Sequence, residues 1–264
     1  TGTDVTKNVA DMILADDNFA TIVAAVREGR RIFDNIKKFL RFLLSSNMGE
    51  VLTVFLGVVF AKILGLSGAN DSLVLPLLAT QILWINLVTD SGPALAMGVD
   101  PETEDVMARP PRKLNQRVID SRMGAGVLIL GTVMAAATLG TIDLFLPGGL
   151  ISGSSSLEVA RTAGFTVLVF AQLFNAFNSR SENASAFHRL FVNPWLLGSV
   201  ALGVALQILV VHLPILNKAF GTSPLTLQEW GICVGMASLV LWASEVRKVL
   251  YRGFGKRESG VEGF

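Results

Sequence analysis

Long apolar stretches are the feature of this sequence that most restricts its fold. A helix needs about 20 mostly apolar residues to cross the hydrocarbon core of a bilayer, and six stretches of the 264-residue chain have about that length. They cover residues 39–64, 76–97, 123–146, 160–178, 195–213 and 227–250. We therefore expect an all-α membrane protein whose six transmembrane helices form a bundle.

The composition supports a chain that lies mostly in a lipid bilayer. Charged residues make up 16% of the sequence, whereas soluble proteins contain about 25%. A net charge of +1 gives no reason to expect a nucleic-acid partner. A single cysteine, Cys233, and two histidines exclude a disulfide framework and a transition-metal site built from thiolates or imidazoles within this chain.

The distribution of Lys and Arg between the apolar stretches predicts the orientation in the membrane. Residues 100–122 contain five of these cations and residues 247–264 contain another five, whereas residues 65–72 and 147–157 contain none. Cytoplasmic loops carry the excess of positive charge. We therefore expect a multi-pass integral membrane protein with both termini in the cytoplasm.

The first 38 residues read as a soluble segment that leads into the membrane. Residues 10–15 could form a short apolar strand, and Asp16 or Asp17 could cap a helix that begins near Phe19. Apolar residues continue at helical spacing from there to Leu40, so one helix should run through a cytoplasmic stalk into the first span. Because the chain opens without an initiator Met or a signal peptide, we expect it to be a fragment of a larger protein.

Two acidic residues lie where lipid-facing spans should be apolar. Asn47 and Glu50 share one face of the first span, and Asn86, Thr89 and Asp90 share one face of the second. Glu50 lies nine residues, about 13 Å, beyond Arg41 and so near the middle of the core. The spans offer neither acid a deep basic partner, so each must be protonated or bound to a cation. Carboxylate, amide and hydroxyl oxygens suit a hard cation such as Ca²⁺.

Two further patterns bear on this site. Gln172, Asn175, Ser179 and Glu182 follow a 3–4–3 spacing in the fourth span, which is consistent with interhelical hydrogen bonds or with further cation ligands. The sequence Ser91-Gly92-Pro93 directly after Asp90 predicts a break in the second span, because proline removes a backbone donor. Broken membrane helices use the freed carbonyl groups to hold ions.

The motifs around these residues resemble the C-terminal transmembrane portion of a type II P-type cation-transporting ATPase. The similarity is greatest to calcium pumps of the sarco/endoplasmic-reticulum type and their bacterial relatives. The matching motifs are Asp11-Met12-Ile13-Leu14-Ala15-Asp16-Asp17-Asn18-Phe19, Ser45-Ser46-Asn47-Met48-Gly49-Glu50, Trp84-Ile85-Asn86-Leu87-Val88-Thr89-Asp90 with Pro93, Met107-Ala108-Arg109-Pro110-Pro111-Arg112, and Asn175-Ala176-Phe177-Asn178 with Ser181-Glu182-Asn183.

The resemblance implies a division of the chain into three parts. Residues 1–38 would be the end of the phosphorylation domain and the cytoplasmic stalk helix, residues 39–250 the six-helix transport domain, and residues 251–264 a cytoplasmic tail. The actuator, nucleotide and phosphorylation domains and the first four membrane helices of the pump would be partners outside this chain. ATP and Mg²⁺ would bind there, so this chain would contain no catalytic residue and would not hydrolyse ATP alone. The segment 100–122 would be a short loop that touches the phosphorylation domain, or a solvated linker.

The resemblance also implies a role for each matching polar residue. Five would be ligands of a first calcium site: Asn47, Glu50, Thr89, Asp90 and Glu182. Asn86 and Asp90 would contribute to a second site, which also needs a glutamate and backbone carbonyls from a helix that this chain lacks. Arg180 stands where animal calcium pumps carry an apolar residue, and it would either neutralise Glu182 or extend to the cytoplasmic interface.

These expectations converge on ATP-driven export of Ca²⁺ from the cytoplasm, in the plasma membrane of a prokaryote. Protons should replace the cation on Glu50 and Asp90 when it leaves, which predicts proton counter-transport. A pump for Na⁺/K⁺, H⁺ or Mn²⁺ would use similar side chains and stays open as an alternative. A passive channel or a non-catalytic membrane subunit would also explain six spans and a polar stripe.

Overall fold

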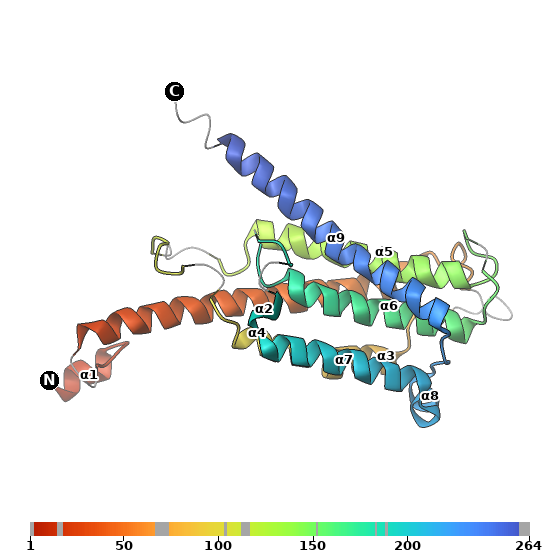
Figure 1. Cartoon of the computed structure of the whole chain (residues 1–264), viewed down its shortest axis with the longest axis horizontal. Coiled ribbons are helices and arrows are strands. Elements are labelled where there is room, and N and C mark those ends of the chain that lie inside the picture. The colour runs from red at the N-terminus through yellow and green to blue at the C-terminus, as the bar shows by residue number, and fades with distance from the viewer. Residues whose placement is uncertain are drawn as a thin grey trace.

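The computed structural model describes residues 3–14, 18–66, 74–102, 105–111, 117–151, 153–182, 184–187 and 190–258, with side chains as far as residue 251. This part of the chain is helical and contains no strand, which confirms the all-α prediction (Figure 1). The elements are α1 (Asp4–Val9), α2 (Phe19–Val59), α3 (Ala79–Trp84), the π-helical turn η2 (Ile85–Thr89), α4 (Ser91–Gly98), α5 (Ser121–Phe145), α6 (Leu157–Asn178), the 3₁₀ turn η3 (Leu190–Val192), α7 (Pro194–His212), α8 (Pro214–Phe220) and α9 (Leu227–Glu258). The predicted strand is wrong over residues 10–14, which form a bend and irregular backbone.

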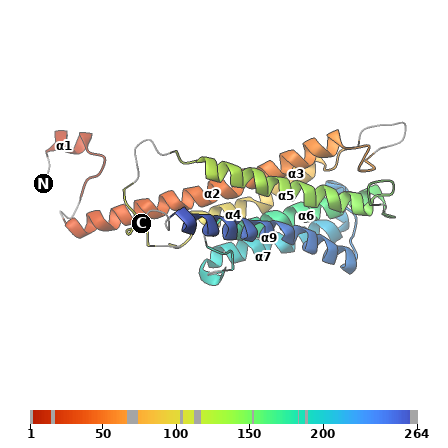
Figure 2. The ribbon, with the colours of Figure 1, turned by 90° about the horizontal axis from the view of Figure 1, so that it is seen from above.

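Helix α2 joins the stalk and the first predicted span in one element of 41 residues, as the sequence predicted. Asn18 caps its start by accepting a hydrogen bond from the backbone N–H of Ala20; the predicted caps Asp16 and Asp17 lie outside the described residues. At 1.5 Å per residue the helix is about 60 Å long, twice the thickness of a bilayer core. One end therefore projects from the bundle beside α1 (Figures 1 and 2). The helix ends at Val59, before the predicted residue 64, and Gly65 turns the chain with a φ of 69°.

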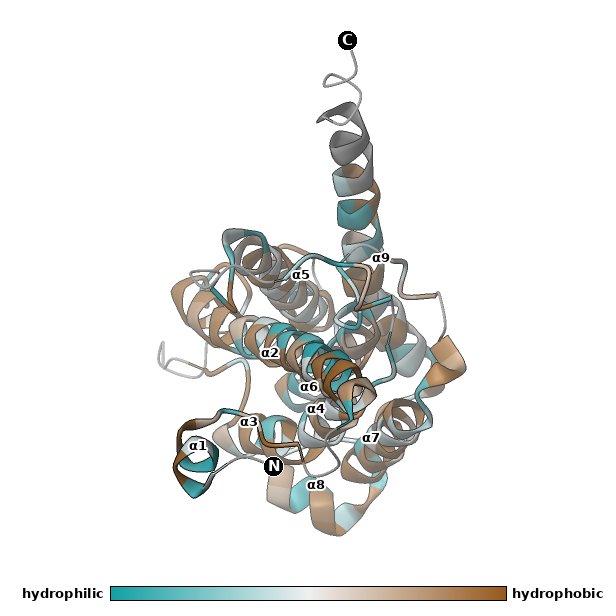
Figure 3. Cartoon of the chain, turned by 90° about the vertical axis from the view of Figure 1, so that its left-hand side faces the viewer, coloured by the Kyte–Doolittle hydropathy of each residue, from teal (hydrophilic) through white to brown (hydrophobic). Residues whose placement is uncertain are grey.

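Helix α6 lies at the centre of the bundle. It contacts α2, α4, α5, α7 and α9, and the end-on view in Figure 3 shows these helices around it. Most of its side chains are buried, including Gln172 and Asn175. The polar stripe predicted from the sequence therefore faces other helices and not lipid.

Four helices of the described residues are long and apolar enough to cross a membrane: α2, α5, α6 and α7. The predicted number of six is not confirmed. The second predicted span, residues 76–97, does not form one long helix, because it is divided into α3, η2 and α4. The broken segment and α9 stay predicted spans.

The break in this segment lies one turn earlier than predicted. In η2 the backbone N–H of Asp90 bonds to the carbonyl of Ile85 at 2.9 Å, five residues back. Pro93 lies in the first turn of α4, where a missing N–H leaves no intrahelical bond unmade. The irregular backbone is therefore formed by the residues that were predicted to bind a cation.

The loop after α4 lies against the projecting part of α2. Arg30 donates a hydrogen bond to the carbonyl of Val106 at 2.8 Å, and Arg109 forms an ion pair with Asp34. The described residues 105–111 therefore contact α2, and whether residues 100–122 also touch the phosphorylation domain stays a prediction.

Candidate cation-binding site

Glu50 is the residue at which three segments of the bundle meet. It lies on α2 and is only 4% exposed. Its carboxylate accepts hydrogen bonds from Asn86 Nδ2 in η2 at 2.5 Å and from Gln172 Nε2 in α6 at 2.9 Å. Two neutral amides thus hold the carboxylate in place without neutralising its charge.

Asp90 directly follows η2 and is 2% exposed. Neither of its carboxylate oxygens has a hydrogen-bond partner within the described residues. Glu50 is the charged group that acts on it electrostatically. A buried carboxylate without a partner is strongly unfavourable, so the site needs a proton or a cation at this position.

The other predicted cation ligands in the first two spans differ in burial. Thr89 is buried, and its hydroxyl donates to the carbonyl of Ile85 at 2.9 Å. Asn47 and Asn86 are exposed, although Asn86 reaches Glu50. The wider π turn explains why Asn86 and Thr89 differ in burial, because the spacing of a regular α-helix would place them on one face.

Glu182 lies apart from this pair in the structure. Its carboxylate accepts a hydrogen bond from Arg41 at 2.6 Å, and Arg41 also donates to the carbonyl of Ser179 at 2.8 Å. Arg41 is about two and a half turns of α2 before Glu50. Arg180, predicted to neutralise Glu182 or to extend to the cytoplasmic interface, is instead buried and donates to Asp100.

Gln172 is a site residue that the sequence did not separate from helix-packing residues. Its amide nitrogen binds Glu50, while its carbonyl oxygen Oε1 is buried and has no partner among the described residues. Asn175, one turn later, repeats this arrangement: Nδ2 donates to Ser45 Oγ at 2.7 Å and Oδ1 is unpartnered. The 3–4–3 spacing was the available signal, but it did not show which face of α6 meets α2.

The assembled groups offer oxygen ligands, and their two carboxylates are not balanced by a basic side chain among the described residues. Within the described residues neither acid forms an ion pair, and no three His, Cys, Asp or Glu residues gather as in a transition-metal site. Two carboxylates together with amide and hydroxyl oxygens match the ligand preference of hard cations. The chemistry of these groups is therefore suited to a cation of this class.

Comparison with known proteins supports this interpretation. A family model described as "Cation transporting ATPase, C-terminus" matches residues 74–250, about two thirds of the chain. A calcium-transporting ATPase of Bacillus subtilis is 38% identical over 239 residues, which is 90% of this chain and 25% of the relative. Calcium-transporting ATPase 1 of Bacillus cereus is 39% identical over 260 residues, 94% of this chain and 28% of the relative.

A plant relative is also named a calcium-transporting ATPase. Calcium-transporting ATPase 2, endoplasmic reticulum-type, of Arabidopsis thaliana is 34% identical over 306 aligned residues, covering 96% of this chain and 28% of the relative. The chain thus spans about a quarter of the length of the curated relatives it matches. The match to the family model, the identities and the oxygen-lined site between helices agree: the chain belongs to the cation-transporting ATPases, of which it forms a C-terminal membrane portion.

Proposed function

We propose that this chain is the ion-binding part of an ATP-driven P-type pump that exports Ca²⁺ from the cytoplasm. The observation that carries the proposal is the Asp90 carboxylate, which is buried within electrostatic reach of Glu50 and has no hydrogen-bond partner for either oxygen among the described residues. The relatives are named calcium-transporting ATPases, which favours Ca²⁺ over Na⁺/K⁺, H⁺ or Mn²⁺ as the cargo.

The proposed ligands fall into two groups. Glu50 and Asp90 provide the negative charge, and the amide and hydroxyl groups of Asn47, Asn86 and Thr89 provide further oxygens. Glu182 stays a proposed ligand, although in this structure its carboxylate binds Arg41 and lies apart from Glu50 and Asp90. Asp90 would serve two ion positions, as the resemblance to calcium pumps implies.

The proposed transport step is a movement of α2 relative to η2. The domains that bind ATP and Mg²⁺ and become phosphorylated would lie in the part of the pump outside this chain, and they would act on the projecting end of α2. Because Glu50 is on α2 and Asp90 follows η2, a tilt of α2 separates the two carboxylates and lowers the affinity for the cation. Protons would then neutralise the emptied acids, so we propose proton counter-transport.

The proposed topology and boundaries follow the sequence. Residues 1–38 would end the phosphorylation domain and form the stalk, residues 39–250 would form the transport domain, and residues 251–264 would be a cytoplasmic tail. Both termini would face the cytoplasm of a prokaryotic cell, with the pump in its plasma membrane. The basic segments 100–122 and 247–264 support this orientation.

The experiment that tests the proposal uses the full-length pump in sealed membrane vesicles. ATP hydrolysis and phosphorylation are measured with micromolar Ca²⁺, micromolar Mn²⁺ or millimolar Na⁺. We expect Ca²⁺ to activate both, and Asp90→Asn to abolish the activation. The control is Asp143→Asn, which alters another buried acid whose carboxylate is satisfied by the backbone N–H groups of Leu150 and Ile151. Normal Ca²⁺ activation in Asp90→Asn would refute the ligand assignment, and activation by Mn²⁺ or Na⁺ alone would refute the cargo.

A further inference from the structure

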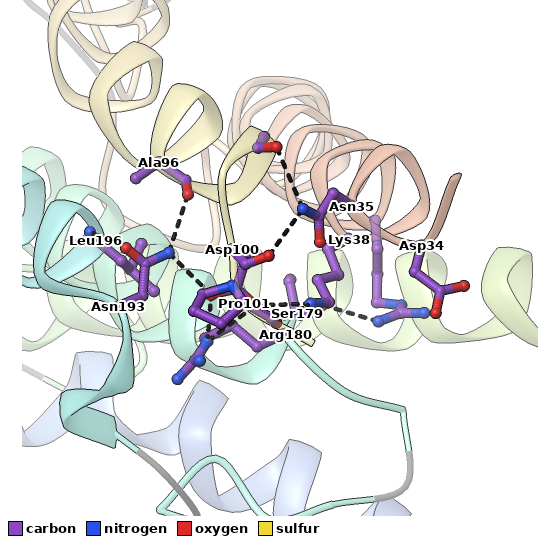
Figure 4. A network of polar contacts seen from close by, with 12 residues as sticks. Asp34, Asn35, Lys38, Ala96, Asp100, Pro101, Ser179, Arg180, Asn193 and Leu196 are labelled. Carbon is purple, nitrogen blue, oxygen red and sulfur yellow. Dashed lines mark hydrogen bonds and ion pairs between the residues drawn. The ribbon is translucent and has the colours of Figure 1, made fainter. Parts of the chain in front are cut away.

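A completely buried acid, Asp100, lies just after α4 at the end of the bundle from which α2 projects (Figure 4). Its carboxylate accepts hydrogen bonds from Lys38 Nζ at 2.7 Å, Asn193 Nδ2 at 2.8 Å and Arg180 Nε at 3.2 Å. These donors come from α2, from the residue that caps α7, and from the turn after α6. All three are at most 6% exposed, so one carboxylate joins three parts of the bundle away from water.

Helix α2 holds the end of α4 through two residues one turn apart, Asn35 and Lys38. While Lys38 binds the side chain of Asp100, the Asn35 amide donates to the carbonyls of Asp100 at 2.9 Å and of Gly98 at 3.2 Å. The last carbonyls of a helix have no partner within that helix. Here α2 supplies the partner of the Gly98 carbonyl, and Asn193, which caps α7, supplies that of the Ala96 carbonyl at 2.9 Å. The end of α4 is therefore bound to α2 through both backbone and side chain, and to the start of α7.

The arrangement of charges allows each contact to be removed separately. Lys38 and Arg180 share one carboxylate, so removal of either cation leaves a one-to-one pair with Asp100. Removal of Asp100 itself would take the carboxylate away from two buried cations at once, which is strongly destabilising. Lys38 and Arg180 are therefore suitable positions for variants that keep the fold.

The other half of the broken segment is attached to a different part of the bundle. Gln81 of α3 donates to the carbonyl of Phe220 at 3.1 Å, and the ring of Trp84 packs edge-on against the Phe220 ring at 4.9 Å. Phe220 is the last residue of α8. The segment 79–98 is thus bound to α8 at its start, and to α2 and the start of α7 at its end, with η2 between these attachments.

We propose that Asn35 and Lys38 are positioning residues that make α4 follow α2, so that movement of α2 deforms the cation-binding residues 85–90. A π-helical turn is the rare and less favourable helical form and is frequent at functional sites; it is the element between the two attachments that changes shape most readily. Asp90 follows that turn, so its position depends on where α2 holds α4. This inference rests on the proposed function as a pump.

The test compares matched variants of the full-length pump in sealed vesicles, by the amount of Ca²⁺ transported per ATP hydrolysed. We expect Lys38→Met to lower this ratio by about two-fold or more, and the double variant Asn35→Ala with Lys38→Met to lower it further. Lys38→Arg should restore it. The control Arg180→Met also removes one donor from Asp100 but leaves the contact between α2 and α4, so its ratio should stay unchanged.

A purely structural role for Asn35 and Lys38 would reduce the amount of folded pump without altering the ratio. An unchanged ratio in the double variant, or an equal loss in Arg180→Met, would therefore overturn the inference. If Lys38→Met does not accumulate in the membrane, Asn35→Ala decides, because it leaves every charge in place; an unchanged ratio there overturns the inference as well. Absence of ATP-driven Ca²⁺ uptake by the unaltered pump would refute the proposed function and this inference with it, whereas normal uptake with unchanged ratios refutes the inference alone.

Discussion

The close contact between α2 and α5 at Gly131 allows a quantitative prediction. A methyl group added there would lie 2.6 Å from Met48 Cγ, 2.8 Å from Met48 Cβ and 3.1 Å from the backbone nitrogen of Gly49. Rotation of the Met48 side chain can move Cγ but cannot move Cβ or the backbone. The Gly131→Ala variant must therefore push α2 away from α5 beside Glu50, and such overpacking costs about 1–3 kcal/mol.

Gly140→Ala in the same helix is the matched control. The added methyl group would meet only the flexible end of Met236, at 3.8 Å, which is an ordinary contact distance. Both variants gain about 0.5–1 kcal/mol because alanine replaces glycine within a helix. The difference between them therefore isolates the packing cost, and we expect Gly131→Ala to be about 1–3 kcal/mol less stable than Gly140→Ala.

The assay is equilibrium unfolding of the purified pump in mixed micelles with increasing amounts of sodium dodecyl sulfate, followed by equilibrium Ca²⁺ binding. Because Gly49 precedes Glu50, we expect weaker Ca²⁺ binding in Gly131→Ala and unaltered binding in Gly140→Ala. Equal stability of the two variants would show that the backbones of α2 and α5 do not approach as closely as described here. Reduced stability with unaltered binding would show that Glu50 does not depend on this contact.

Three further predictions concern side chains at and near the site. Gln172→Leu removes a hydrogen bond to the Glu50 carboxylate and should weaken Ca²⁺ binding about ten-fold or more, measured by equilibrium binding; a change below two-fold would contradict a role in the site. Glu182→Gln should weaken Ca²⁺ binding less than Asp90→Asn does, because Arg41 already occupies this carboxylate; an equal loss would show that Glu182 binds the cation in the resting state. Asp120 caps α5 by accepting from the Met123 backbone N–H at 2.7 Å, which lowers the pKa of its carboxyl, so Asp120→Ala should cost about 1 kcal/mol at pH 7. Because this pKa is lower in the folded protein than in the unfolded chain, where it is about 3.9, the stabilisation is complete above about pH 4 and is lost as the pH falls through the folded-state value. The thermal midpoints of variant and parent should therefore converge as the pH falls below about 4, and a constant difference would argue against a charged cap.

The sequence predicted those features of the fold that depend on the local pattern. Apolar stretches predicted an all-α chain, and the unbroken helical spacing from Phe19 predicted that stalk and first span form one helix, which is confirmed. Charge inside apolar stretches singled out Glu50 and Asp90, and both are buried. The helix predictions succeeded because a bilayer places strong constraints on length and polarity within a single segment, whereas the roles of the two acids stay predictions.

The features that the sequence did not predict depend on contacts between segments. The pairing of Glu182 with Arg41 joins residues 141 positions apart, and spacing within α6 does not indicate this partner. The burial of Asp100 was equally inaccessible, because a charged residue after a span usually lies in water and only the tertiary structure supplies Lys38, Arg180 and Asn193. The position of the π turn was missed because Pro93 predicted a break at the proline itself, whereas the first turn of a helix tolerates proline.

The unbroken length of α2 has a mechanical consequence when it is combined with the attachment at Lys38. Phe19 is about 28 Å from Lys38 along the helix, and Glu50 is about 18 Å away on the other side. Because the inferred attachment moves α4 together with α2, Lys38 is not a fixed pivot. If the helix tilts as a rigid rod about Glu50, whose carboxylate is held by amides of η2 and α6, a movement of the Phe19 end by about 3 Å moves Lys38 by about 1 Å. Metal–oxygen distances tolerate about 0.2 Å, so a displacement of this size, passed on to α4, would be enough to move the proposed ligand Asp90 out of bonding distance.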